Sequence, residues 1–556
     1  LVSKVLPMRS HTVAAEGGAA GVVLDVDSLD NHFDDTVSGG DWLCDQDAVR
    51  FFVERCTEEM TRLEHWGCPW SRREDGTVAV RAFGGMKTER TWFAADRTGF
   101  HILHTLFQSS LAHSVIERLD EHFCVDLVVD GGRCHGVVVV DMAGGELCFV
   151  RAPAVILATG GAGRVYRQNT NAGIVTGDGM GMAYRNGAAL RDMEFVQWHP
   201  TALPGTGILI TEGCRGEGGV LVNADGRRYL QDYGLGPPEP WPRKKAMELG
   251  PRDQLSQAFW HEERAGRTIA TPGGQAVHLD LRRLGAARLH ERLPQIVELA
   301  RTFVGVDPVR APIPVRPAVH YTMGGILTDL TTATEIDGLF ACGECASVGI
   351  HGANRLGSNS LAELSVFGRV AGQAAAAHAR EAAGSPSAAA LGRARAIEAA
   401  ALAPLARPAG GERLADVREA MHDAMEEGVG IFRDGAGMQR ACDRLAELRD
   451  RVTMVSLDDR SRAFNTEWLT RLELGFMLDV AEAMAVSALG REESRGAHQR
   501  VDGFEGRDDE RFLTHTLARH RPGAAPALEY RPVNITRSAP AARVYGGAAE
   551  ATEGVP

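Results

Sequence analysis

Residues 339–364 place one carboxylate and one guanidinium in a single glycine-rich loop. The loop follows a short apolar strand at 339–341 and leads into a helix expected to begin near Ser358. Its glycines let backbone N–H groups approach a ligand, and the helix start offers unpaired N–H groups to an anion or a carbonyl. Glu344 can accept from sugar hydroxyls, and Arg355 can pair with an anion in the same space. The combination predicts a cofactor cradle, whereas an ordinary strand-to-helix turn needs one glycine and no charged pair.

Two further glycine-rich turns support this prediction. Glycines cap an apolar strand at 160–163, and a second turn at 175–183 enters a helix with Asp178 as its acid. One such turn alone is weak, but three of them favour a dinucleotide site. His11 lies in the loop 7–18, between two hydroxyl side chains and before a pair of glycines. A loop histidine is more often a surface residue than a reactive one.

The first half of the chain supplies elements that can carry these loops. A short strand is expected within 1–5, and apolar residues at helical spacing predict helices at 45–70 and 98–122. Period-two alternation over 123–157 predicts an antiparallel meander, with turns at 130–132 and 143–145.

The second half changes character along its length. Residues 193–318 are more polar and richer in Gly and Pro, including PPEPWP at 237–242. Residues 380–410 are rich in Ala, Arg and Pro and predict a helix and a linker, and heptad-like patterns over 413–495 predict a helical domain. From 505 onward, a small strand-containing segment and a frayed end are expected.

Composition excludes several classes of protein. The chain of 556 residues is too long for one core, and its net charge of −13 disfavours nucleic acid as a partner. No apolar run approaches the roughly 18 residues of a membrane span. Ten scattered cysteines suggest a reducing compartment, and Cys342 and Cys345 lack a second pair at zinc spacing, so no metal site is predicted.

Longer runs carry a family resemblance. SKVLPMRSHTVAAEGG at 3–18, GGDWLCDQDAV, WGCPWSRR and FGGMKTERTWFAADRTGFHILHTLFQ resemble the flavoprotein subunit of bacterial fumarate reductase, a close relative of succinate dehydrogenase. The resemblance implies FAD bound covalently through His11, since the family's linking histidine occupies that position. The third relative, L-aspartate oxidase, lacks this histidine.

The resemblance implies an α/β fold: a Rossmann-like FAD-binding domain with an inserted α+β capping domain, followed by a helical domain and a small C-terminal segment. The expected bounds are 1–192 and 319–380 for the FAD-binding domain, 193–318 for the cap, 381–504 for the helical domain and 505–556 for the last segment. The family's opening strand, G-x-G-x-x-G turn and first helix are not found in this sequence. We interpret the sequence as a fragment; loss of that unit is the alternative.

Residues that match the family's catalytic machinery come from distant points in the sequence. The implied substrate-binding residues are His199, Thr211, His320 and Arg355, with Arg355 and His320 on one carboxylate and His199 and Thr211 on the other. Arg252 is the implied proton donor, although arginine normally keeps its proton in proteins, and Glu212 and Arg215 are the implied relay that reprotonates it. Cys214 lies in the same run, either as a reactive thiol beside an arginine or as an inert buried one.

The implied FAD contacts share positions in the loops and helix starts described above. They are Val2, Ser3, Lys4, Ser10, His11, Thr12, Val13, Ala14, Ala15, Glu16, Gly17, Gly18, Asp178, Glu344, Ser360 and Leu361. Ser360 and Leu361 begin the helix whose N–H groups would face the flavin's pyrimidine edge and stabilise negative charge there.

By resemblance, the chain is the FAD-dependent catalytic subunit of fumarate reductase. It would interconvert fumarate and succinate by hydride transfer from flavin N5 and proton donation, and exchange electrons with quinol through an iron–sulfur subunit and membrane anchor subunits. A flavin assembly factor is a possible further partner, and the expected location is peripheral, on the cytoplasmic face of the inner (plasma) membrane. The alternatives are a succinate dehydrogenase flavoprotein, an L-aspartate oxidase, or an inactive N-terminally truncated flavoprotein fragment.

Overall fold

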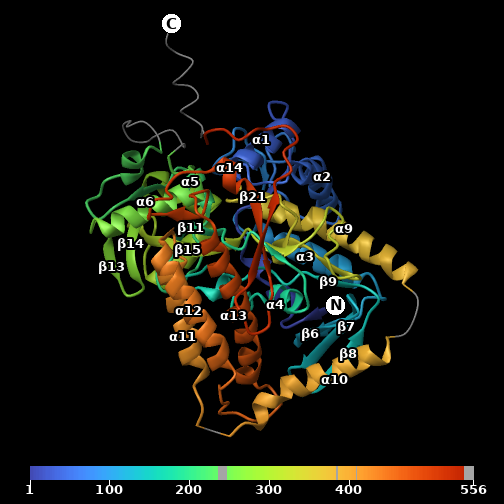
Figure 1. The fold of residues 1–556 in the computed structure, drawn as a ribbon. Helices are drawn as coiled ribbons and strands as arrows, with labels where there is room; N and C mark the ends of the chain where they lie inside the picture. Colours follow the sequence, from blue (N-terminus) through green and yellow to red (C-terminus); the bar gives the residue numbers. More distant parts are fainter. Residues whose placement is uncertain (236–246, 383–385, 409, 544–556) are drawn as a thin grey trace.

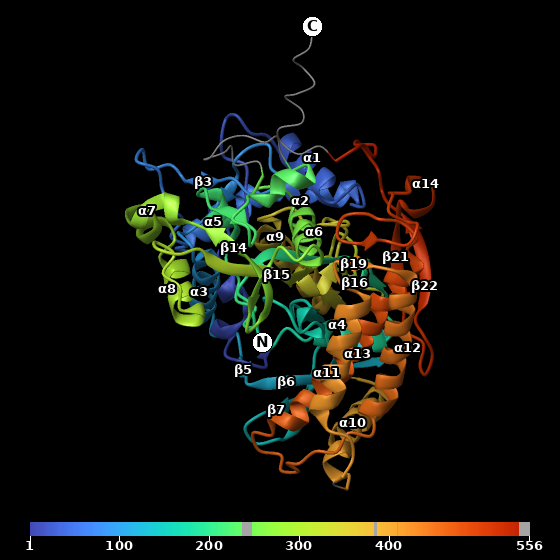
Figure 2. The same cartoon turned by 90° about the vertical axis from the view of Figure 1, so that its left-hand side faces the viewer.

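A computed structural model describes residues 1–235, 247–382, 386–408 and 410–543. The chain forms an α/β body, a cap on one side of it, and a set of long helices along another side (Figures 1 and 2). The proline-rich run at 237–242 lies outside the described residues.

The α/β body is built from short strands. One sheet has the order β18 (Ala346–Ser347), β16 (Gly325–Leu327), β10 (Leu190–Arg191), β21 (Thr514–Arg519) and β22 (Ala527–Pro532). Parallel pairs join β1 (Val2–Ser3) to β5 (Leu119–Asp120) and β17 (Leu339–Ala341) to β9 (Val155–Leu157). Strands of the predicted C-terminal segment therefore complete a sheet that β10 and β16 begin.

The predicted meander is confirmed. Strands β6 (His122–Asp130), β7 (Arg133–Asp141) and β8 (Leu147–Arg151) form an antiparallel sheet. Valines of β7 are buried because they pack into the largest hydrophobic cluster, which also holds helices α4 and α13.

Helices cover the first part of the body. These are α1 (Leu29–Gly39), α2 (Gln46–His65), α3 (Thr98–Leu111), α4 (Asp178–Arg185) and α9 (Asn359–Glu381). The helix expected over 45–70 is α2. The helix expected over 98–122 is shorter than predicted, because α3 ends at Leu111. Beyond it the chain turns so that β5 can pair with β1.

The cap has its own core. Its main sheet has the order β11 (Val196–Ala202), β15 (Ile313–Thr322), β14 (Gly274–Asp280) and β12 (Val220–Val222), with β13 (Ile269–Thr271) paired to β14. Helices α5 (Glu212–Gly216), α6 (Arg252–Arg264), α7 (Gly285–Arg292) and α8 (Pro294–Val304) pack around it. The cap boundary expected at 318 falls inside β15, so one strand runs from the cap into the body.

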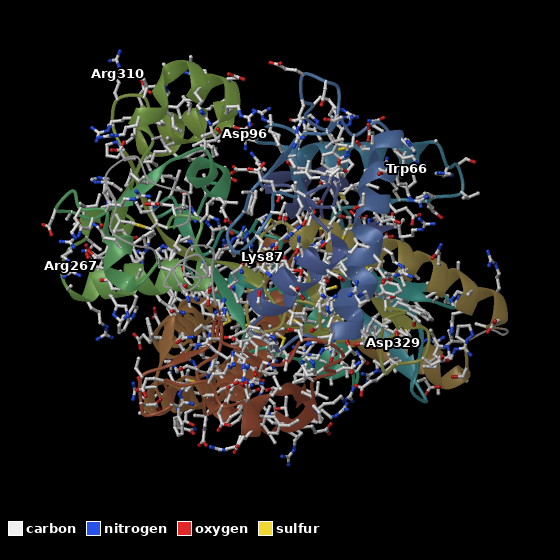
Figure 3. All side chains as sticks on the ribbon, turned by 90° about the horizontal axis from the view of Figure 1, so that it is seen from above. Trp66, Lys87, Asp96, Arg267, Arg310 and Asp329 are labelled. Atoms are coloured by element: carbon white, nitrogen blue, oxygen red, sulfur yellow. The ribbon has the colours of Figure 1, made fainter. Side chains whose placement is uncertain are left out.

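Side chains of the cap and the body meet along one edge. Asp96, labelled in Figure 3 beside the cap, accepts from the backbone N–H of Gln295 at 2.8 Å, at the start of α8. Gln295 also accepts from Arg97 at 2.8 Å. These contacts hold the cap closed over the body.

The helical region matches the prediction for 413–495. It contains α11 (Leu414–Gly428), α12 (Gly435–Val452) and α13 (Thr466–Gly490), preceded by α10 (Ala388–Leu402). The remaining short elements are β2 (Ala19–Ala20), β3 (Val80–Arg81), β4 (Thr91–Trp92), β19 (Phe432–Arg433), β20 (Gln499–Arg500) and α14 (Asp509–Phe512). Among the described residues, no helix combines the length and the apolar character needed to cross a membrane.

Candidate active site

A cavity of about 400 Å³ lies where the cap meets the body. Its wall contains residues of the histidine loop, of two glycine-rich turns, of the cap and of the cradle at 339–364. These segments are separated by hundreds of residues in the sequence, so only the fold brings them together.

All four predicted substrate-binding residues line this cavity. His199 lies on β11 and His320 on the neighbouring strand β15, with ring centroids 5.1 Å apart. Thr211 caps the N-terminus of α5 and accepts from Gly213, and Arg355 lies in the loop before α9. The site therefore combines two imidazoles, a hydroxyl and a guanidinium within one small volume.

Both histidines are neutral. Burial, together with the nearby charge of Arg252, holds the pKa values of His199 and His320 well below the usual range. The Nδ1 atom of His199 lies 3.3 Å from the backbone nitrogen of Thr201 and 3.2 Å from its backbone oxygen. His320 Nδ1 lies 2.8 Å from the Thr170 hydroxyl. Neutral imidazoles can donate one hydrogen bond each to a carboxylate.

Arg355 and Arg252 both contact one amide oxygen. Arg355 Nη2 and Arg252 Nη1 donate to Oε1 of Gln197, at 3.1 and 3.0 Å. Arg355 also lies over the ring of Tyr321, with 4.3 Å from the guanidinium carbon to the ring centroid. Burial and the neighbouring Arg252 lower the pKa of Arg355 to about 10, so it stays cationic at neutral pH. Two cations held this close favour an anion between them.

The predicted relay residues form a buried chain. Arg252 Nε donates to Glu212 Oε2 at 2.9 Å, and Arg215 Nη2 lies 3.8 Å from the same oxygen. The other carboxylate oxygen accepts from the backbone N–H of Gly84 at 2.6 Å. Burial opposes the charge on Glu212, but Arg252 and Arg215 hold its pKa below the usual value. The carboxylate is ionised, and the surface ion pair that these residues could have formed is excluded because both are buried.

His11 lies in a short 3-10 turn, His11–Ala14, and lines the cavity. Its Nδ1 accepts from the backbone N–H of Ala172 at 3.3 Å, and its Nε2 lies 3.2 Å from the Asn171 amide. Burial lowers the pKa of His11 to about 4. The ring is therefore neutral, and its single proton lies on Nε2 when Nδ1 accepts from Ala172.

The cradle accommodates a bulky polar cofactor. Glycine at 161 is required because a Cβ there would lie 2.2 Å from Glu344 Oε1. Glu344 accepts from the backbone N–H of Thr322 at 3.0 Å, and burial raises its pKa to about 7. Ser358 Oγ and Arg355 Nε line or border the same cavity and are buried without a hydrogen-bond partner. Orphaned polar atoms around an open volume fit a ligand with sugar, phosphate and heterocyclic groups.

Most of the predicted cofactor contacts lie in this cavity wall, but several do not. Those in the wall are Ser10, His11, Thr12, Ala15, Glu16, Gly17, Gly18, Glu344, Ser360 and Leu361. Those outside it are Val2, Ser3, Lys4, Val13, Ala14 and Asp178, and the relay residue Arg215 lies behind the wall. Lys4 pairs with Asp178 at 2.7 Å and with Glu473 of α13 at 2.7 Å. In this structure Lys4 and Asp178 join the first strand to the helical region.

Cysteines of the predicted site are buried. Cys214 is fully buried, and burial with the nearby Glu16 carboxylate raises its pKa well above the usual range, so it is a thiol. Cys342 and Cys345 are free thiols. In the described ranges, no group of three metal-binding side chains comes together.

Sequence reasoning missed several residues of the site. Gln197 joins the two arginines, Phe83 and Tyr321 line the cavity, and Asn171 contacts His11. Gln197 lies two residues before His199, and that proximity was the available signal. Asn171 has no comparable signal, because only the fold brings its loop to His11.

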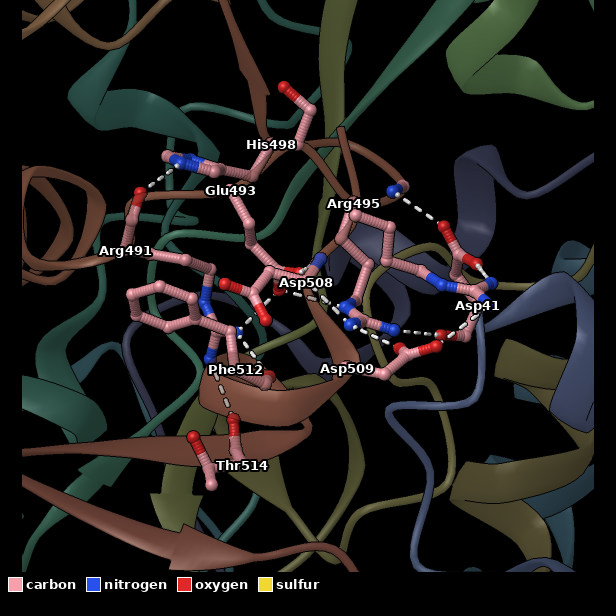
Figure 4. Close-up of polar contacts among 12 residues, drawn as sticks. Asp41, Arg491, Glu493, Arg495, His498, Asp508, Asp509, Phe512 and Thr514 are labelled. Carbon is pink, nitrogen blue, oxygen red and sulfur yellow. Dashed lines mark hydrogen bonds and ion pairs between the residues drawn. The ribbon is translucent and has the colours of Figure 1, made fainter. Parts of the chain in front are cut away.

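A buried network behind the site holds the Arg355 loop (Figure 4). Arg495 donates to the backbone oxygen of Asp41 at 2.9 Å, and Gly496 N–H donates to the Asp41 carboxylate at 3.1 Å. Asp41 has a positive φ of 54°, a left-handed conformation that costs free energy in a non-glycine residue. The adjacent Gly40 carbonyl accepts from Ala353 N–H at 2.9 Å, two residues before Arg355. The C-terminal region thus supports the substrate loop.

Comparison with known proteins agrees with this geometry. Residues 1–361 match the family model described as FAD binding domain, and residues 418–545 match the model described as fumarate reductase flavoprotein C-term. The fumarate reductase flavoprotein subunit of Proteus vulgaris is 64% identical over the whole chain and 93% of its own length. The succinate dehydrogenase flavoprotein subunit of Rickettsia bellii is 41% identical, over 98% of this chain and 94% of its own.

A solved structure of quinol fumarate reductase from E. coli superposes with a TM-score of 0.96 at 61% identity, covering 98% of this chain and 94% of that one. The α/β fold expected from the sequence is confirmed by this match. The chain belongs to the fumarate reductase and succinate dehydrogenase flavoprotein family, on the fumarate reductase side of it.

Proposed function

We propose that this chain is the FAD-dependent catalytic subunit of a fumarate reductase and interconverts fumarate and succinate. The observation that carries the proposal is the convergence of His199, Thr211, His320 and Arg355 on the cavity that His11 also lines. FAD, when bound, supplies the hydride and accepts it in the reverse direction. Close relatives named fumarate reductase flavoprotein subunit, at 57–64% identity, favour this activity over succinate dehydrogenase, whose named relative is 41% identical.

A dicarboxylate fits the charges of the site. Arg355 and neutral His320 bind one carboxylate, and neutral His199 with the Thr211 hydroxyl binds the other. Gln197 holds Arg355 in place, and the Tyr321 ring covers one face of its guanidinium. Fixing both ends of the substrate holds the double bond in one orientation and can twist one carboxylate out of conjugation.

Arg252 is the proton donor in this proposal. It faces the cavity, and its Nε and Nη2 atoms each lie 2.9 Å from Oε2 of Glu212. Glu212 is ionised at rest, so it must first take a proton from Arg215, which lies behind it, before it can return that proton to Arg252. The buried chain therefore carries a proton from Arg215 to Glu212 to Arg252 and on to the substrate carbon.

His11 holds FAD covalently through Nε2 in this proposal. Its Nδ1 is engaged with Ala172 N–H, and its low pKa leaves the ring unprotonated at neutral pH. Because Nδ1 is the acceptor, the single ring proton lies on Nε2, and a covalent bond at Nε2 would form with loss of that proton. Glu344 and the start of α9 hold the rest of the cofactor.

The chain works with redox partners in this proposal. A solved relative is a quinol fumarate reductase, and another contains menaquinol. We propose that an iron–sulfur subunit and membrane anchor subunits exchange electrons between this chain and quinol, and that a flavin assembly factor assists attachment at His11. The chain would then lie peripherally on the cytoplasmic face of the membrane.

The test measures turnover of three substrates by FAD-loaded protein with an artificial electron donor or acceptor. Reduction of fumarate is expected, with oxidation of succinate in the reverse assay and none of L-aspartate. Turnover of L-aspartate alone would defeat the proposal. Acid-denatured protein is expected to keep flavin fluorescence on the peptide that contains His11, whereas His11→Ala protein releases its flavin.

Protein without flavin absorbance near 450 nm, even after incubation with FAD, would favour an inactive flavoprotein fragment. Oxidation of succinate without any reduction of fumarate would favour the succinate dehydrogenase assignment. Each of these outcomes favours one functional assignment over the others.

A further inference from the structure

A second cavity of about 400 Å³ shares no lining residue with the candidate active site. Its lining residues come from α10, α12 and α13, from strand β6 of the meander and from helix α4. Figures 1 and 2 show where these elements lie. We call it the arginine cleft. Its charged lining residues are Asp126, Arg185, Arg393, Arg449, Arg471 and Asp479.

The lining carries more positive than negative charge. Four arginines face two aspartates, a formal surplus of two positive charges. Arg185 is paired with Asp479, and Arg449 is paired with Glu482 at 2.9 Å, outside the cleft. Asp126 accepts from the backbone N–H of Leu127 and from the Asn186 amide, both at 2.8 Å. With Glu482 counted, four arginines face three carboxylates, because Asp126 stays near Arg393, and the remaining positive charge is that of Arg471.

The charged groups that shift the pKa of Arg471 are both arginines. The Nε atom of Arg471 is buried without a hydrogen-bond partner, and no acidic residue of the described chain lies within ion-pair distance. Burial, together with Arg407 and Arg185, lowers the pKa of Arg471 to about 10. Nη1 of Arg407 is likewise buried without a partner. Uncompensated guanidinium groups at a cavity are costly unless an anion joins them.

Gly475 forms an open floor between two of the guanidiniums. A Cβ at this position would lie 3.1 Å from Arg185 Nη2 and 3.9 Å from Arg471 Nη1. The glycine stands inside the 25-residue helix α13, where it costs about 0.5–1 kcal/mol relative to alanine. Its absent side chain leaves the space in which both guanidiniums can reach one ligand.

The rest of the wall is apolar. Ile397 of α10 and Phe476 of α13 line the cleft, with Val125 of β6 and Val452 of α12. A free inorganic ion would use the arginines but not this surface. The cleft therefore suits a ligand with an anionic head and an apolar body.

We propose that the arginine cleft binds a small organic phosphate or carboxylate, with Arg471 on the anionic head and Arg393 closing over it. Guanidiniums recognise both head groups bidentately, and the cavity has room for one ring-sized body. The site is separate from the catalytic cavity, so its ligand is not fumarate at the active site.

The test uses isothermal titration of FAD-loaded protein with phenyl phosphate, while excess succinate occupies the active site. One phenyl phosphate is expected to bind per chain. Arg471→Met is expected to weaken binding at least tenfold, about 1.4 kcal/mol. The matched control is Arg395→Met, which changes an exposed arginine of the same helix as Arg393, outside the cleft, and is expected to change binding less than twofold.

A second variant places a methyl group between the two guanidiniums instead of removing charge. Gly475→Ala is expected to weaken phenyl phosphate binding as well, while raising the melting temperature or leaving it unchanged because alanine favours the helix. Inorganic phosphate is expected to bind more weakly than phenyl phosphate, since it leaves the apolar wall unused.

Absence of binding at millimolar phenyl phosphate overturns the proposal. So does equal binding by the wild type, Arg471→Met and Gly475→Ala proteins, which would place the phosphate elsewhere. Equal affinity for inorganic phosphate and phenyl phosphate would show that the apolar wall does not contribute to binding. It would overturn the proposal that the ligand is organic.

Discussion

Arg495 is predicted to be the most sensitive residue of the network that supports the substrate loop. Its side chain is fully buried and donates four hydrogen bonds of 2.8–2.9 Å, to the Asp41 backbone oxygen, to both oxygens of Glu493 and to Asp509. Arg495→Met removes the charge and leaves the Glu493 carboxylate, also fully buried, with Arg491 as its remaining cation.

The magnitude follows from burial. Breaking a buried ion pair by removing one partner costs about 3–5 kcal/mol of unfolding free energy. Arg507 provides the matched control, because it also contacts Asp41 and Asp509, at 2.9 and 3.0 Å, but its side chain is 22% exposed. Arg507→Met is expected to cost only about 0–1 kcal/mol.

The assay is urea unfolding of FAD-loaded protein, followed by tryptophan fluorescence, with fumarate reduction measured on the same samples. Arg495→Met also releases the Asp41 turn, so the Ala353 N–H loses its fixed partner, the Gly40 carbonyl, and Arg355 loses its position. If Arg355 then loses about 1.4 kcal/mol of binding, KM for fumarate rises about tenfold. Equal stability losses for the two variants, or an unchanged KM in Arg495→Met, would refute this reasoning.

Three further predictions concern separate groups. Glu212→Gln is expected to lower kcat by about 100-fold or more, since it breaks the proton path to Arg252, with a smaller effect on KM; a purely structural role would instead change KM and stability together. His515 lies between Asp192 and Asp45, and although burial disfavours its charge, the two carboxylates raise its pKa to about 9. This raised pKa contributes about 3 kcal/mol of stability below pH 6.5, which is lost as the pH rises through 9, so His515→Asn should flatten the stability profile over that range in unfolding experiments. Iodoacetamide at pH 7 is expected to label the exposed Cys148 before the buried Cys214 and to leave fumarate reduction unchanged; rapid loss of activity with label on Cys214 would show that this thiol is accessible.

Local patterns in the sequence predicted most of the elements. Period-two alternation predicted the meander, and helical spacing predicted α2 and the helical region, because both depend on residues close in the sequence. The glycine-rich turn before α9 was also predicted, with Glu344 and Arg355 in it. Chemistry-bearing residues such as His11, His199 and Arg252 were recognised through their motifs.

Long-range packing decided the rest. The chain turns after Leu111 so that β5 can pair with β1, and strands β21 and β22 join a sheet begun more than 300 residues earlier; neither pairing is visible in local periodicity. Burial alone distinguishes an inert Cys214 from a reactive one. Gln197 becomes a bridge only when two distant arginines approach it, and Arg471 is left without an acidic partner only when α10 and α13 close around it. A sequence names the groups that can react, but the free energy of a charge depends on neighbours that the tertiary fold supplies.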